Sequence, residues 1–199
     1  MISITPLLTG LSMVLLSLAW VTILLPMKKL PPAARIIVIM GIALLLMLPL
    51  FDYPGWYKVR GIFGDSSITA VLFYSALVLQ QNFSWQLYRG EELVLLRRLV
   101  LLTAMLLYPF ALGLTQFDSY RLGYANPWML ATLLLLTLFC WFRHYYFIAT
   151  IITIAVIAGS LQLLESQNLW DYLIDPAFVL ILLLCWLRPS VKGKQPAVA

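Results

Sequence analysis

The sequence predicts an all-α protein, a polytopic transmembrane bundle whose helices cross a membrane several times. Three observations support this prediction. The chain of 199 residues is 63% hydrophobic and only 11% charged, whereas soluble domains average about 45–50% apolar and about 25% charged residues. The apolar residues form repeated long runs, and the basic residues stand in short clusters at the ends of those runs. Lipid forces each spanning segment to satisfy its own backbone hydrogen bonds, so such runs predict helices.

A helix of about 20 apolar residues crosses a bilayer, and this length divides the chain into seven expected spans. They are residues 5–26, 34–51, 67–84, 93–115, 127–142, 147–164 and 170–188. The first run ends without a small-residue cleavage pattern, so we expect it to be retained and not removed as a signal peptide. Six and eight spans are the alternatives. Residues 1–188 are interpreted as one transmembrane domain, and residues 189–199 as a short, basic, disordered tail.

The basic residues favour one orientation of the bundle. Seven spans place the termini on opposite sides, and cytoplasmic loops carry the excess of Lys and Arg. Only Lys58, Arg60 and Arg121 fall on one side. The other side receives Lys28, Lys29, Arg35, Arg89, Arg97, Arg98, Arg143, Arg188, Lys192 and Lys194. We therefore expect the amino terminus outside and the carboxyl terminus in the cytoplasm.

The expected outer loops, residues 52–67, 115–126 and 165–176, mix acidic with aromatic residues. Six of the eight acidic residues fall on this face: Asp52, Asp65, Asp118, Glu165, Asp171 and Asp175. Asp65 precedes two serines and the third span, a position typical of a helix N-cap. Asp118 stands three residues before Arg121, which predicts an ion pair within the loop. The alternative is that Arg60 and Arg121 bind acids of other loops, or a phosphate or carboxylate.

The segment NLWDYLIDP, residues 168–176, precedes the last apolar run. Asp175 followed by Pro176 predicts a helix cap and a first helical residue. The twelve residues that remain would span only about 18 Å, short of a hydrocarbon core of about 30 Å. Either the helix continues backward through residues 169–174 with a kink, or that segment enters the membrane as a re-entrant piece. Both alternatives place Asp171 and Asp175 at or below the outer interface, and Asp171 is the better functional candidate.

The sequence offers little catalytic chemistry. The single histidine, His144, excludes bis-histidine haem ligation and multi-histidine metal sites. The two cysteines lie inside apolar runs and indicate no disulfide framework. No cofactor and no metal are expected. The basic clusters at span ends are topology signals, so no nucleic-acid partner is expected.

We interpret the chain as a multi-pass protein of a bacterial inner membrane whose outer loops form an acidic, aromatic cap. It would bind membrane lipids or a glycan intermediate, or contact an envelope-assembly enzyme, as an accessory or binding subunit in cell-envelope lipid or glycan assembly. The alternatives are a small transporter or flippase, and a membrane enzyme acting on a lipid head group at the periplasmic face. The residues expected to bind the ligand or partner are Asp52, Arg60, Asp65, Asp118, Arg121, Trp170, Asp171 and Asp175.

Overall fold

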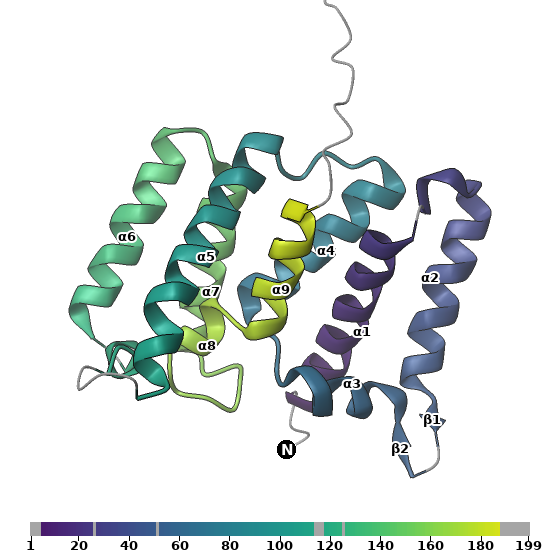
Figure 1. Ribbon diagram of the computed structural model, residues 1–199, viewed down its shortest axis with the longest axis horizontal. Helices are drawn as coiled ribbons and strands as arrows, with labels where there is room; N and C mark the ends of the chain where they lie inside the picture. Colours follow the sequence, from purple (N-terminus) through teal and green to yellow (C-terminus); the bar gives the residue numbers. More distant parts are fainter. Residues whose placement is uncertain (1–4, 26, 51, 114–117, 125, 188–199) are drawn as a thin grey trace, which may run out of the picture.

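The computed structural model describes residues 5–25, 27–50, 52–113, 118–124 and 126–187, and this part of the chain is mostly helical (Figure 1). The elements are α1 (Thr5–Leu24), η1 (Met27–Lys29), α2 (Pro32–Met47), β1 (Pro49–Leu50), β2 (Tyr53–Pro54), α3 (Gly55–Phe63), α4 (Ile68–Phe83), α5 (Gly90–Ala111), η2 (Tyr120–Gly123), α6 (Pro127–Phe142), α7 (Tyr146–Ser160), α8 (Trp170–Leu173) and α9 (Pro176–Leu187). The predicted tail, residues 189–199, lies outside the described residues.

Within the residues that the structure describes, three helical segments are long and apolar enough to cross a membrane. They are Pro6–Leu24, Gly90–Ala111 and Trp170–Leu187. Helices α2, α4, α6 and α7 fall in the other four expected spans, but they contain only 15 or 16 residues. The structure therefore supports a helical membrane fold with three candidate spans, and the count of seven stays a prediction.

The last candidate span is interrupted. Ile174 has an extended backbone (φ −149°, ψ 140°), so α8 ends before it and α9 begins afresh at Pro176. One kinked continuous helix through residues 169–174 is therefore wrong. α9 has the twelve residues that the Asp175-Pro176 pair predicts.

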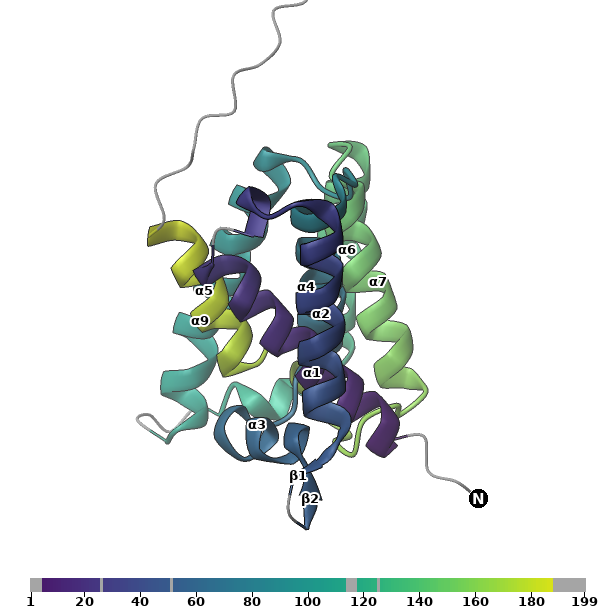
Figure 2. The same ribbon diagram turned by 90° about the vertical axis from the view of Figure 1, so that its right-hand side faces the viewer.

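The long helices pack in two layers. α2, α1, α4, α7 and α6 follow one another as a row, and α5 and α9 pack together across it (Figures 1 and 2). The main core lies between the layers, where Phe73, Tyr74 and Phe178 are fully buried. Because successive long helices run antiparallel, all their connections gather at two ends of the bundle.

One end of the bundle carries short elements that the sequence did not predict. β1 and β2 pair as a tight antiparallel hairpin, and α3 follows it directly. Trp56 of α3 is buried, and Val59 and Phe63 pack against the core. Their spacing of three and four residues gives α3 one apolar face, which is a helical pattern. Residues 55–63, expected as loop, are therefore an amphipathic helix that lies across the end of α1.

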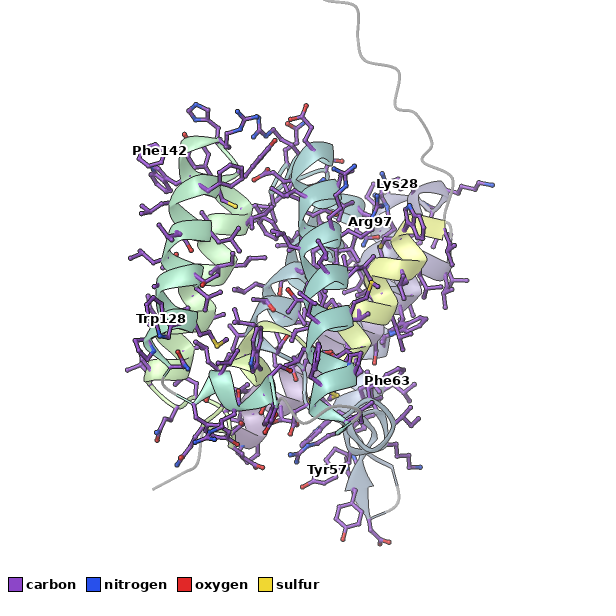
Figure 3. The ribbon with its side chains drawn as sticks, turned by 60° about the vertical axis from the view of Figure 1, so that its left-hand side comes forward. Lys28, Tyr57, Phe63, Arg97, Trp128 and Phe142 are labelled. Atoms are coloured by element: carbon purple, nitrogen blue, oxygen red, sulfur yellow. The ribbon has the colours of Figure 1, made fainter. Side chains whose placement is uncertain are left out.

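The two ends differ in charge. We call the end with the hairpin, α3 and α8 the hairpin end, and the opposite end, with η1 and the α4–α5 and α6–α7 connections, the arginine end (Figure 1). Side-chain nitrogen and oxygen atoms gather at these two ends, with mostly carbon between them (Figure 3). The segments that contain the six acids expected on one face lie at the hairpin end (Figure 1), whereas Lys28 and Arg97 lie toward the other (Figure 3).

Candidate functional site

A cavity of about 330 Å³ lies at the hairpin end, below the C-terminal end of α5. It is assembled from four separate segments, and four of its lining residues are carboxylates. The lining residues are Asp65, Leu107, Tyr108, Ala111, Tyr120, Leu164, Glu165, Ser166, Asp171, Ile174, Asp175 and Pro176. We call this space the acidic cavity. Its floor is apolar, from α5 and Ile174, while its rim is acidic and phenolic.

Asp175 fastens two helices together beneath the acidic cavity. Its Oδ1 accepts the backbone N–H of Phe178 at 2.8 Å and so caps α9, as predicted. Its Oδ2 accepts both the N–H and the hydroxyl of Ser67, each at 2.8 Å. Only 4% of Asp175 is exposed. The carboxylate is therefore held by donors from two helix N-termini, where helix dipoles favour negative charge.

Ser67, and not Asp65, is the N-cap of α4. The Ser67 hydroxyl accepts the N–H of Ala70 at 3.2 Å while it donates to Asp175. Asp65 lies two residues earlier and bonds to Arg60, so the capping role predicted for it is wrong. The physical reason is distance along the chain: the capping oxygen belongs to the residue directly before the first helical one.

Asp171 and Tyr120 connect the two other loops across the acidic cavity. The Tyr120 hydroxyl donates to Asp171 Oδ2 at 2.7 Å. Burial raises the pKa of the Tyr120 phenol, and the hydrogen bond to Asp171 raises it further, so the phenol stays a donor. Among the described residues, Asp171 Oδ1 accepts no hydrogen bond. One carboxylate oxygen at the cavity thus stays available to a ligand.

The segment around Asn168 holds this arrangement in place. Asn168 is fully buried, donates to the carbonyl of Tyr120 at 2.9 Å, and accepts the N–H of Trp170 at 2.9 Å. The Trp170 indole donates to the carbonyl of Ser119 at 3.1 Å. Gly123 must be a glycine, because a Cβ there would lie 2.6 Å from Asn168 Cγ. Trp170 therefore positions the loops and does not line the acidic cavity.

Arg60 lies beside the acidic cavity and pairs with two of its lining carboxylates. Its Nε and one terminal nitrogen bond the two oxygens of Asp65 at 2.7 and 2.9 Å, a bidentate pair, and Glu165 lies 3.6 Å away. The hydrogen bond to Asp65 raises the pKa of Arg60, against the opposing effect of desolvation. Arg60 is thus already shared between two carboxylates, which leaves little positive charge for an anionic ligand.

Tyr108 adds a donor that no partner satisfies. It lines the acidic cavity, and its hydroxyl is shielded from solvent without a hydrogen-bond partner among the described residues. A buried hydroxyl without a partner is costly, by about 1–3 kcal/mol. The sequence did not single out Tyr108, because it lies inside an expected span just before Pro109.

Besides Arg60 and Trp170, three predicted site residues do not line the acidic cavity. Asp52 is exposed in the hairpin turn. Asp118 accepts the N–H of Tyr120 at 2.9 Å, a local turn, and forms no ion pair with Arg121 among the described residues. Arg121 is exposed and does not line the cavity. The predicted Asp118–Arg121 pair is therefore wrong, and neither residue supports anion binding here.

Tyr120 and Glu165 also line the acidic cavity, although nothing in their local sequence distinguishes them from other residues of the expected outer loops. They reach the cavity because the second and third expected outer loops pack against each other. His144 lies at the arginine end, where its Nδ1 is 2.7 Å from the Tyr146 hydroxyl. Within the described residues, no three His, Cys, Asp or Glu side chains are grouped closely enough to bind a metal ion.

Comparison with protein-family models, with curated proteins and with solved structures finds no match for this chain.

Proposed function

We propose that the protein is a multi-pass protein of a bacterial inner membrane, whose acidic cavity faces the periplasm and binds the hydroxyl- or amine-bearing head group of a lipid or glycan intermediate. In this proposal it acts as an accessory or binding subunit beside an envelope-assembly enzyme. The observation that carries the proposal is the convergence of four carboxylates and two tyrosines on one cavity of about 330 Å³.

The exposed surface of α6 supports a membrane location. Trp128 and Phe142, near its two ends, are 79% and 75% exposed. Several leucines between them are also exposed, and α6 contains no charged residue. An apolar surface of this extent is rare on soluble monomers, and aromatic residues at both ends are typical of membrane interfaces. At about 1.5 Å per residue, α6 is about 24 Å long, and a slightly thinned bilayer would cover it.

The charges at the two ends favour seven spans with the hairpin end outside. Basic residues dominate the arginine end and acidic residues the hairpin end, and α1, α2, α4, α5, α6, α7 and α9 run alongside one another between the two ends. The positive-inside rule then assigns the arginine end to the cytoplasm.

The chemistry of the acidic cavity favours a ligand that donates hydrogen bonds. Asp171 Oδ1 is an available acceptor, and Arg60 is already paired with Asp65 and Glu165. Phosphate would meet uncompensated negative charge, whereas sugar hydroxyls or an amine would meet acceptors. Cavities of this volume are at the lower end of the range for small-ligand sites, about 300–1,000 Å³. One head group or sugar unit matches that size.

Cysteine labelling tests the orientation. In a background with Cys140 and Cys185 replaced by alanine, Tyr57→Cys is expected to react with a membrane-impermeant maleimide in intact cells. Lys29→Cys is expected to react only after the inner membrane is permeabilised. The reverse pattern would show that the hairpin end faces the cytoplasm.

Lipid retention tests the ligand. The protein is reconstituted with glucosyl diacylglycerol or with phosphatidylcholine, and retained lipid is measured by native mass spectrometry. Asp171→Asn is expected to weaken glycolipid retention about tenfold, since a hydrogen bond to a charged group contributes about 1.5–3 kcal/mol. Asp52→Asn, at the same end but outside the cavity, is the matched control. Equal retention in both variants would contradict the proposed site.

A further inference from the structure

A second cavity lies at the arginine end, between α5 and α6. It measures about 470 Å³. Its lining residues are Gly90, Glu91, Val94, Leu95, Arg98, Phe139, Arg143 and Tyr145. Arg98 comes from the third turn of α5 and Arg143 directly follows α6, so two guanidinium groups from different segments line one space. We call this space the basic groove.

The basic groove has a net positive lining. Arg98 and Arg143 are both exposed, and neither forms an ion pair among the described residues. Glu91 is the one acid in the lining. Glu92 follows it in the chain, but its carboxylate is buried and accepts the N–H groups of Arg89 and Phe147. Two cations against one exposed acid favour an anionic ligand, and guanidinium groups suit phosphate oxygens.

An apolar crevice lies about one helical turn further along α5 and α6, where Leu99 and Leu136 follow Leu95 and Phe139 of the basic groove. It is narrow, about 80 Å³. α5 and α6 contribute Leu96, Leu99, Val100, Thr103, Leu133 and Leu136 to its walls. α6 packs mainly on α7, while α5 packs on α9 and α7. A basic opening above an apolar crevice matches an amphiphile with an anionic head.

We propose that the basic groove binds an anionic phospholipid, with its phosphate on Arg98 and Arg143 and the end of one acyl chain in the α5–α6 crevice. The apolar crevice favours a phospholipid over a free phosphate, because a free phosphate would make no contact with the leucines of the crevice. Basic pockets between helices on the cytoplasmic side are a recurrent setting for phospholipid head groups. The basic groove shares no lining residue with the acidic cavity, and a lipid there would complete the packing between α5 and α6.

Nanodiscs of phosphatidylcholine with increasing phosphatidylglycerol test this proposal, with retained lipid measured by native mass spectrometry. The double variant Arg98→Gln/Arg143→Gln is expected to lower phosphatidylglycerol retention about thirtyfold, since each arginine near the surface contributes about fivefold. Glu91→Gln is expected to raise retention about threefold to fivefold by removing the opposing charge. Opposite responses at neighbouring positions would be hard to obtain from a loss of folding.

Arg97→Gln is the matched control. Arg97 adjoins Arg98 in α5, but its guanidinium lies over the Trp186 ring, 5.8 Å from the centroid, and outside the basic groove. Phosphatidylglycerol retention should not change in this variant. A loss as large as in the double variant would overturn the proposal and indicate general attraction to positive charge. Displacement of phosphatidylglycerol by soluble glycerol phosphate would overturn the claim that the ligand is a lipid, because the crevice would then contribute nothing to binding. Asp171→Asn should leave phosphatidylglycerol retention unchanged, which separates this site from the acidic cavity.

Discussion

Each end of the bundle is fastened by one buried carboxylate shared between two helix N-termini. At the hairpin end, Asp175 caps α9 and accepts two hydrogen bonds from Ser67 at the start of α4. At the arginine end, Glu92 accepts the N–H of Arg89 at the start of α5, and the N–H of Phe147 at the start of α7. Both residues are 4% exposed. The two ends therefore use the same device, in which backbone amides and helix dipoles stabilise a buried charge.

The surroundings of the two carboxylates differ. Glu92 has a cation nearby, with Arg89 Nε 3.6 Å from its Oε2. Asp175 instead lies beside the acidic cavity with Asp171, Asp65 and Glu165. The comparison separates structure from function at the hairpin end. The hydrogen bonds that Asp175 accepts hold helices together, whereas Asp171 Oδ1 accepts no hydrogen bond from the residues that the structure describes.

The largest effect is expected from Asp175→Ala. The substitution leaves the N–H groups of Ser67 and Phe178 buried without an acceptor, while the Ser67 hydroxyl can still turn toward Thr69, 3.2 Å away. We expect the free energy of unfolding to fall by about 3 kcal/mol, at about 1–3 kcal/mol for each unsatisfied group. Thermal unfolding in detergent micelles measures the change. Asp52→Ala, exposed at the same end, should unfold as the wild type does, and a stable Asp175→Ala protein would refute the fastening role.

A smaller loss is expected from Glu92→Ala at the arginine end. Two backbone donors lose their acceptor, but the N–H of Arg89 lies at a helix start where water can replace the carboxylate. We expect a loss of about 2 kcal/mol in the same unfolding experiment. Glu91→Ala is the control, because that neighbouring carboxylate is exposed. A larger loss of unfolding free energy in Glu92→Ala than in Asp175→Ala would reverse this ranking. It would show that the nearby Arg89 makes Glu92 the more important of the two carboxylates.

Local signals predicted much of the fold. Long apolar runs located every long helix, and the Asp175-Pro176 pair located the start of α9 because capping needs only neighbouring residues. α3 was missed because two glycines and two charged residues hid the spacing of Trp56, Val59 and Phe63. The apolar face of α3 can be recognised only in the folded protein, where α3 contacts α1.

The acidic cavity was less predictable because it depends on contacts between distant segments. Asp171, Asp65 and Asp175 were expected at one face and do line one cavity. Tyr108 was missed, since nothing local distinguishes it from other aromatic residues near a span end. Asp118 and Arg121 looked like a pair by spacing, but the backbone N–H of Tyr120 is a nearer donor to Asp118.

The smallest effect is expected at the rim of the acidic cavity, from Arg60→Gln. Its bidentate pair with Asp65 is partly exposed, with 29% and 46% of the two side chains accessible. Solvent screening limits such a pair to about 0–1 kcal/mol, so we expect a loss of less than about 1 kcal/mol. In 1 M NaCl, where the Debye length is about 3 Å, variant and wild type should unfold alike. Although Arg60→Gln should slightly lower the stability of the protein, it should not lower ligand binding. The substitution frees Asp65 and Glu165 as acceptors, so retention of glucosyl diacylglycerol should rise or stay level. A loss of retention beyond the loss of stability would show that Arg60 itself contacts the ligand, and the acidic cavity would then have to be reinterpreted as a site for anions.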